Sequence, residues 1–139
     1  MESMPNGNLT YRRGEIRWVK LDPTIGAEIQ KRLAPVGFPD AKSETRQTRS
    51  CLILQNDTMN QYGQLTIAIP FRPGIKQAPY VVNVAATDLN GLDRDRFLDV
   101  AQIRSIDGQR VLGLVGILED NYWQQIQTAL SIVCGFGLV

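Results

Sequence analysis

The sequence predicts a mainly β domain, a small barrel of six or so short strands followed by one C-terminal α-helix. Short apolar stretches recur at close spacing between polar turns, which is typical of small barrels. After residue 120 the apolar residues instead recur at helical spacing. The chain has 139 residues, 43% of them hydrophobic and 21% charged, a size and balance that fit one globular domain with a buried core.

Three strands are expected in the first half of the chain. Residues 14–21 alternate between apolar and polar side chains and stop before Pro23. Residues 50–55 form a nearly continuous apolar run, typical of a buried strand, which an Asn-Asp pair breaks. Residues 64–70 alternate again, and Pro70 is expected to end this third strand.

The second half is expected to add a turn, three further strands and one short helical turn. Residues 72–74 form the turn, and residues 80–84 form the next strand. Residues 93–97 are expected to make one helical turn, since an Asp at their start can cap it. Residues 99–106 and 110–118 flank an Asp-Gly pair, which is a strong hairpin signal.

The C-terminal stretch predicts an amphipathic helix whose apolar face lies on the core. Asp120 is the expected N-cap and Gly135 the expected C-cap. The apolar positions at helical spacing are Trp123, Ile126, Leu130 and Val133.

The regions outside these elements carry their own predictions. Residues 1–10 are polar and are expected to form a disordered tail, without the apolar core of a signal peptide. Since no apolar run approaches the roughly 20 residues of a membrane span, the expected compartment is the cytoplasm. Residues 24–48 show no clean period, and a loop of that length in a compact domain is typically functional or mobile.

The composition limits the chemistry that the chain can perform. No histidine is present, which removes the commonest general acid or base and the commonest metal ligand. Cys51 and Cys134 are too few for a zinc cluster and are expected to be free buried thiols, so no metal or cofactor is expected. Residues 1–50 carry nine basic against six acidic side chains, and eleven of the fifteen basic residues are Arg, which suits phosphate.

Three blocks, in order, resemble the MazF/PemK/Kid family of toxin endoribonucleases. RGEI at 13–16, followed by LDPTIGAE at 21–28, resembles the family's R-G-[ED]-[IV] and L-[DS]-P-x-x-G-x-E. RSCLILQN at 49–56 is similar to the R-P-[AV]-[LV]-V-[IL] strand of the family, and QIRSID at 102–107 resembles its D-Q-[IV]-R-[ST]-[IV] signature. The resemblance covers residues 11–134.

This resemblance implies an SH3-like barrel over residues 11–139, with a long basic loop insertion at 29–48, and a homodimer. It implies the toxin of a type II toxin–antitoxin system, which cleaves single-stranded mRNA without metal, and an antitoxin protein that covers the RNA groove. In the family the 2′-hydroxyl attacks its own phosphate and leaves a cyclic phosphate and a 5′-hydroxyl.

Arg49 aligns with the catalytic arginine of the family, which implies that it stabilises the charge that develops on the phosphate. The residues alone leave an alternative, in which Arg49 closes a loop and pairs with a carboxylate such as Glu28. The basic loop is either a flap that follows the phosphates or a solvated insertion. Residues expected to contact RNA are Thr24, Glu28, Lys31, Arg32, Arg46, Thr48, Arg72 and Lys76.

The departures from the family pattern concern the other chemical groups. The family usually has a catalytic Thr or Ser where this chain has Pro70, which offers neither a hydroxyl nor an N–H. An Arg, an Asp and a His proposed to act in the Kid branch correspond here to Asp99, Ala101 and Ala27. What works beside Arg49 is therefore open. The inserted loop offers replacement hydroxyls at Ser43, Thr45 and Thr48.

Three functions follow from these observations. The leading hypothesis is an endoribonuclease toxin centred on Arg49. The alternative is a catalytically silent barrel that binds RNA or a protein target, since the CcdB-type toxins have the same barrel yet act on gyrase by binding. The third is an autorepressing DNA-binding role together with the antitoxin.

Overall fold

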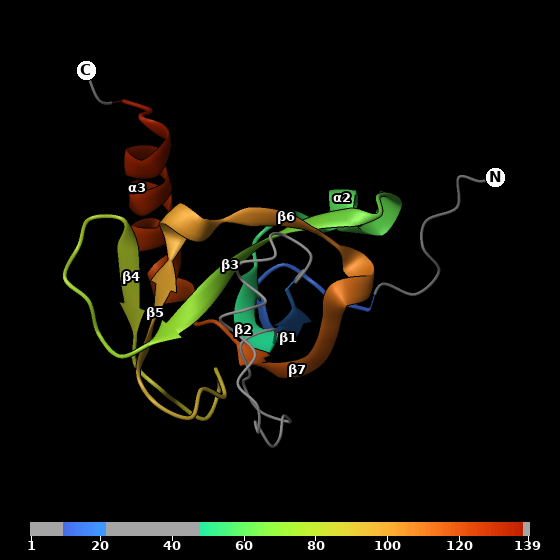
Figure 1. Ribbon diagram of the computed structural model, residues 1–139, viewed down its shortest axis with the longest axis horizontal. Coiled ribbons are helices and arrows are strands. Elements are labelled where there is room, and N and C mark those ends of the chain that lie inside the picture. Colours follow the sequence, from blue (N-terminus) through green and yellow to red (C-terminus); the bar gives the residue numbers. More distant parts are fainter. Residues whose placement is uncertain (1–9, 22–47, 138–139) are drawn as a thin grey trace, which may run out of the picture.

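A computed structural model of the chain describes residues 10–21 and 48–137 (Figure 1). Three 3-10 turns accompany its strands and helices: η1 Val100–Gln102, η2 Gly108–Arg110 and η3 Asp120–Tyr122. The strands and helices are β1 Glu15–Lys20, β2 Thr48–Ile53, α2 Asp57–Tyr62, β3 Leu65–Pro73, β4 Val81–Val84, β5 Arg96–Asp99, β6 Arg104–Asp107, β7 Val111–Ile117 and α3 Trp123–Cys134.

The seven strands form one antiparallel sheet in the order β4-β5-β3-β2-β1-β7, with β6 paired to β3 beside this path. The sheet curls strongly, and α3 packs against β4 and η1 (Figure 1). The prediction of a mainly β chain with a C-terminal helix is confirmed. β6 and β7 pair with β3 and β1 and not with each other, so the curled sheet is not closed between them.

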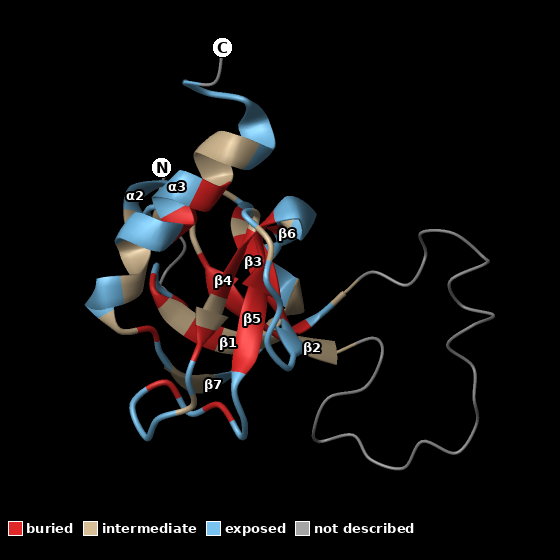
Figure 2. Cartoon of the chain, turned by 90° about the vertical axis from the view of Figure 1, so that its left-hand side faces the viewer, coloured by how far each residue is buried: buried red, intermediate tan, exposed pale blue. Residues whose placement is uncertain are grey.

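Two apolar cores lie on opposite faces of the central strands. On β2, Leu52 belongs to the larger core, whereas its neighbours Cys51 and Ile53 belong to the smaller one. Alternation therefore buries both faces of this strand, which explains its continuous apolar run. In Figure 2, the residues of β5 and those in the middle of β3 are likewise coloured as buried. The smaller core consists of Tyr11, Val19, Cys51, Ile53, Ala68 and Ile106.

α3 lies on the larger core through Ile126 and Ala129, which are 1% and 2% exposed. Trp123 and Leu130 pack against the same core, as their spacing predicts, whereas Val133, expected on the same face, is exposed. Gly135 adopts a φ of 80°, and its N–H closes the last turn, so the predicted C-cap is confirmed. The start is different, because η3 intervenes and α3 begins at Trp123.

Pro70 does not end its strand, so that prediction is wrong. β3 continues to Pro73, and the turn expected at 72–74 begins only at Gly74. The physical reason is a change of partners at this point. Ala68 is the last β3 residue paired with β6, and Phe71 is the first paired with β5.

The other side of Pro70 also tolerates the missing N–H. Pro70 pairs with Cys51 of β2. The N–H of Leu54 donates to the carbonyl of Ile67 at 2.8 Å. This pair of residues lies three positions along the β2–β3 ladder from the Cys51–Pro70 pair. Since hydrogen-bonded and non-hydrogen-bonded pairs alternate in an antiparallel ladder, Cys51 and Pro70 form a non-hydrogen-bonded pair. Proline therefore costs β3 no hydrogen bond with β2.

Three further local predictions are wrong: a helical turn at 93–97, one strand over 99–106 and a hairpin at the Asp-Gly pair. Residues 99–106 instead contain the end of β5, η1 and most of β6. The stretch expected as a helical turn at 93–97 leads directly into β5. The break after β2 is the start of a helix that was not predicted, α2, where the Asn56 side chain accepts from the N–H of Met59. The Asp-Gly pair after β6 opens η2 rather than a hairpin, and β7 then runs to β1.

Of the two cysteines, Cys51 is buried as expected, whereas Cys134 is exposed at the end of α3. Both are free thiols, in agreement with the sequence prediction. The described residues contain no helix long and apolar enough to cross a membrane. The expected tail at 1–10 falls outside the described residues except for Thr10, and the insertion at 29–48 falls outside except for Thr48.

Candidate functional site

Arg49 lies near the start of β2, opposite Val19 of β1. Paired residues of antiparallel strands place their side chains on the same face, and so do alternate residues of one strand. Arg49 therefore shares a face with Cys51 and, through the Cys51–Pro70 pair, with Pro70 of β3. This face carries the smaller core, and Arg49 continues it toward the end of the sheet.

Arg72 and Asp99 form an ion pair on the neighbouring strands. Arg72 follows Pro70 by two residues and therefore lies on the same face of β3. Its Nη1 lies 3.5 Å from Oδ2 of Asp99, the last residue of β5. The Asp99 side chain is 12% exposed and the Arg72 side chain 58% exposed. A largely buried carboxylate thus holds a guanidinium that remains open to solvent.

Lys76 lies in the exposed loop between β3 and β4, and Asn83 fixes its backbone. The Lys76 N–H donates to Oδ1 of Asn83, and Nδ2 of Asn83 donates to the Lys76 carbonyl, both at 3.0 Å. Nζ of Lys76 lies 5.2 Å from the ring centroid of Tyr80, a cation–π contact. The loop that follows Arg72 therefore presents a further cation, Lys76, and an aromatic ring, Tyr80.

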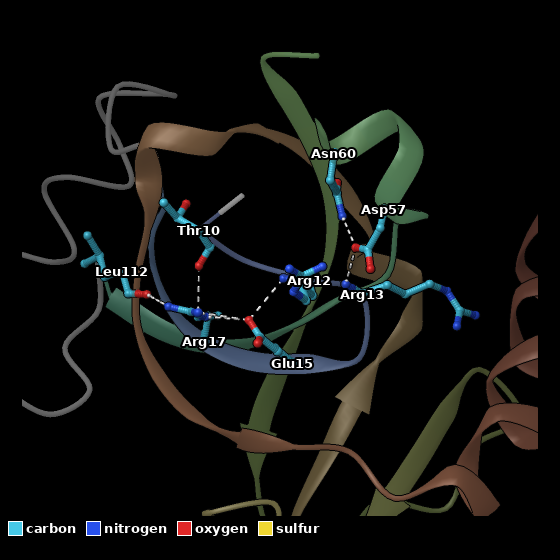
Figure 3. A network of polar contacts seen from close by, with 8 residues as sticks. All are labelled: Thr10, Arg12, Arg13, Glu15, Arg17, Asp57, Asn60 and Leu112. Atoms are coloured by element: carbon cyan, nitrogen blue, oxygen red, sulfur yellow. Dashed lines mark hydrogen bonds and ion pairs between the residues drawn. The ribbon is translucent and has the colours of Figure 1, made fainter. Parts of the chain in front are cut away.

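Arg17 has a structural role at the base of the sheet (Figure 3). Its Nε donates to Oε1 of Glu15 at 3.0 Å, Nη1 to the carbonyl of Leu112 at 3.0 Å, and Nη2 to the carbonyl of Thr10 at 2.7 Å. These bonds tie β1 to β7 and to the segment that precedes β1. Arg17 therefore uses its donors within the protein, although it lies on the same face as Cys51.

Arg13 is also held internally, at the turn before β1. Its N–H donates to Oδ1 of Asp57 at 2.7 Å, as Figure 3 shows, and its Nε donates to the carbonyl of Leu54. Its guanidinium carbon lies 4.0 Å from the ring centroid of Trp123. Arg13 thus links the N-terminal turn, α2 and α3, and contributes to the scaffold.

Tyr11, a residue of the smaller core, has a pKa that differs from its ordinary value. Burial raises the pKa of the Tyr11 hydroxyl above its ordinary value, and the negative charge of Asp107 raises it further. The phenol therefore remains protonated at neutral pH. Tyr11 acts as a packing residue of this core rather than as a base.

The structure brings together part of the predicted site. Arg49 and Arg72 lie on one face, Lys76 lies in the loop after Arg72, and Thr48 opens β2 opposite Lys20. The pairing of Arg72 with Asp99 was not predicted, because it depends on β3 and β5 being neighbours. The predicted residues that lie outside the described part of the chain are Thr24, Glu28, Lys31, Arg32 and Arg46.

The curled antiparallel sheet with its C-terminal helix is the fold that the comparisons with known proteins test. Residues 33–134 match the model of a family described as PemK-like, MazF-like toxin of type II toxin–antitoxin system. This match covers more than half of the chain, and the chain therefore belongs to the PemK/MazF toxin family.

Individual relatives agree with this assignment. The chain is 28% identical over 126 residues to the endoribonuclease EndoA of Bacillus subtilis, covering 89% of this chain and 94% of the relative. An endoribonuclease in complex with its cognate antitoxin from Mycobacterial species has the same fold, with a TM-score of 0.65 at 15% identity over 94% of this chain and all of that one. A MazE–MazF structure from Deinococcus radiodurans gives 0.62 at 18% identity, with 90% of this chain and 96% of that one covered.

Proposed function

We propose that this toxin is a metal-independent endoribonuclease that cleaves single-stranded mRNA, with Arg49 at the reacting phosphate. The observation that carries the proposal is the position of Arg49 near the start of β2, where the face of the smaller core reaches the end of the sheet, in a PemK/MazF family member. Relatives named as endoribonucleases and solved with antitoxins support this activity and a cognate antitoxin partner. We include in the proposal a homodimer, the cytoplasm as its compartment, and a single domain over residues 11–139.

The chemistry needs little from the protein beyond charge and position. When the 2′-oxygen attacks the adjacent phosphorus, negative charge grows on the non-bridging oxygens. The bond to the 5′-oxygen then breaks, which leaves a 2′,3′-cyclic phosphate and a 5′-hydroxyl. A guanidinium offers a planar fork of donors to two phosphate oxygens and stays charged at every physiological pH. Arg49 is therefore suited to stabilise the transition state without histidine or metal.

The loop cation extends this proposed site along the RNA. Lys76 and Tyr80 offer a charge for the backbone and a ring face for a base. We include Thr24, Glu28, Lys31, Arg32, Arg46 and Thr48 in this proposed RNA contact, the last four because of the charges and hydroxyls that the inserted segment carries.

The test is cleavage of a long RNA by the purified protein in EDTA, with the new 5′-hydroxyl ends mapped. Arg49→Ala is expected to lose at least ~100-fold in kcat, the usual cost of removing a donor to a developing oxyanion. Arg12→Ala is the matched control, because Arg12 is exposed and lies outside the candidate face. Cleavage by Arg49→Ala at the rate of the control would remove Arg49 from the mechanism.

The second candidate function is an RNA-binding barrel that does not cleave. Pro70 favours it, because a buried proline stands where the family carries a hydroxyl. RNA binding that weakens steeply with salt, with no product after hours, would support this function and contradict the first.

A further inference from the structure

Building on the proposed endoribonuclease function, we propose that Arg72, oriented by Asp99, is the second cation of the site and replaces the hydroxyl that Pro70 lacks. Arg72 would be a catalytic residue that contacts the phosphate, and Asp99 a positioning residue that acts through it. The proposal rests on the geometry of the ion pair and on the register of three neighbouring strands.

The strand register places the two arginines on one face. Cys51 and Pro70 are paired, and the residues two positions further toward the same end of each strand are Arg49 and Arg72. Alternate residues share a face, so both guanidinium groups project from the same side of the sheet. A phosphate bound on this face would contact Arg49 from β2 and Arg72 from β3. Pro70 lies on the same face of β3, two residues before Arg72.

The ion pair is asymmetric in a way that suits a ligand. Asp99 is 12% exposed, so its carboxylate is largely buried, whereas Arg72 is 58% exposed. A guanidinium has five donor hydrogens, and the contact to Asp99 uses one nitrogen, Nη1, at 3.5 Å. The carboxylate therefore reduces the conformations available to Arg72 while most of the fork stays open to solvent.

The chemical step balances with water as the proton carrier. The 2′-oxygen loses its proton to water and bonds to phosphorus, and the bond between phosphorus and the 5′-oxygen breaks with its electron pair on that oxygen. The leaving oxygen takes a proton from water and becomes the 5′-hydroxyl. Arg72 transfers no proton, because a guanidinium is not deprotonated in proteins. It donates hydrogen bonds to the oxygens on which charge grows, which a hydroxyl would otherwise do.

The experiment measures kcat and KM for cleavage of a short RNA that carries one mapped cleavage site, together with the midpoint of thermal unfolding. Arg72→Ala is expected to lower kcat by ~100-fold with an unfolding midpoint equal to that of Arg12→Ala. Asp99→Asn, which keeps the shape but removes the charge, is expected to lower kcat by about tenfold with little change in KM, and Arg72→Lys to retain part of the rate.

The double variant Arg72→Ala/Asp99→Asn separates catalysis from simple charge neutralisation. If Arg72 only neutralises the buried carboxylate, removing both charges restores the wild-type kcat. We expect the double variant to fold and to stay as slow as Arg72→Ala. Restored kcat, or an Arg72→Ala variant as fast as the Arg12→Ala control, would overturn the role of Arg72 while the wild type still cleaves. A wild type that cleaves no RNA would overturn the proposed function itself.

Discussion

Replacing Pro70 by threonine should convert this chain toward the usual chemistry of its family. Pro70 forms a non-hydrogen-bonded pair with Cys51, and its other side lies where β3 changes from β6 to β5. A threonine therefore fits the strand without displacing a partner. Its hydroxyl would lie on the same face as Arg49 and Arg72, where it could donate to the reacting phosphate.

The expected size of this effect follows from one hydrogen bond to a charged group. Such a bond is worth about 1.5–3 kcal/mol. Because each 1.36 kcal/mol is tenfold in rate, the rise in kcat has an upper limit of about ten- to a hundredfold, and it is smaller where Arg72 already stabilises the same oxygens. In the free protein the buried hydroxyl can cost about 1–3 kcal/mol if it finds no partner, and loss of the proline adds about 0.4–1 kcal/mol through the unfolded chain. Pro70→Thr should therefore be less stable but faster.

The assay compares Pro70→Thr with Pro70→Val on a short RNA substrate in EDTA. Valine has the shape of threonine without the hydroxyl, so it removes the proline and tests the backbone effect alone. Only the threonine variant should gain in kcat. Equal rates for the two variants, both folded by circular dichroism, would show that a hydroxyl at this position contributes nothing and would refute the reasoning.

The remaining predictions concern the scaffold. Leu52→Ala in the larger core, where Leu52 is fully buried, should lower the free energy of unfolding by about 2–5 kcal/mol in a urea titration, and a loss under 1 kcal/mol would contradict the packing. Gly116→Ala would place a Cβ 2.2 Å from the Asn90 carbonyl carbon, so it should yield a protein with a thermal midpoint below that of Leu52→Ala. For Glu119, burial alone would raise the pKa, but hydrogen bonds from Thr87 and Asn90 outweigh burial and lower it. Because folding lowers this pKa, ionised Glu119 stabilises the protein above the ordinary carboxyl range, and this stabilisation is lost as the pH falls through the lowered pKa. Glu119→Gln should therefore destabilise at pH 7 and match the wild type only below that lowered pKa.

Local sequence patterns predicted the strands and helices that can be recognised without knowing which element each one packs against. β1 follows from the alternation of its side chains, and α3 follows from helical spacing, because burial of one face of a helix gives the sequence that period. The continuous run of β2 was equally informative, since Leu52 faces one core and Cys51 the other. In each of these cases the side chains and their order along the chain carry the information.

The errors arose where tertiary pairing overrides a local signal. An Asp-Gly pair normally closes a hairpin, yet here Asp107 accepts from the N–H of Gln109 at 2.8 Å and Gly108 donates to Gln64. These contacts turn the chain away from β6 toward β1. Pro70 reads as a strand terminator for the same reason, because nothing in its neighbours along the chain reveals a change of strand partner.

The site shows the same division between residue identity and residue partner. Alignment singled out Arg49 and Arg72, and the absence of histidine restricted the chemistry to groups of this kind. The pairing of Arg72 with Asp99 was out of reach, because the two residues are 27 positions apart and meet only through the β3–β5 ladder. Asp99 could be recognised from sequence as a departure, but its function as the partner of a cation required the fold.

The proline and the arginine should prove to be coupled rather than independent. If the Arg72 guanidinium performs the task that a hydroxyl at position 70 performs elsewhere in the family, either group can stabilise the same phosphate oxygens, and their effects on kcat should not add. Arg72→Ala should then cost much less in the Pro70→Thr background than in the wild type. An equal fold-loss in the two backgrounds would mean that the two positions act on different atoms of the substrate, and Pro70 would then be a loss that Arg72 does not offset.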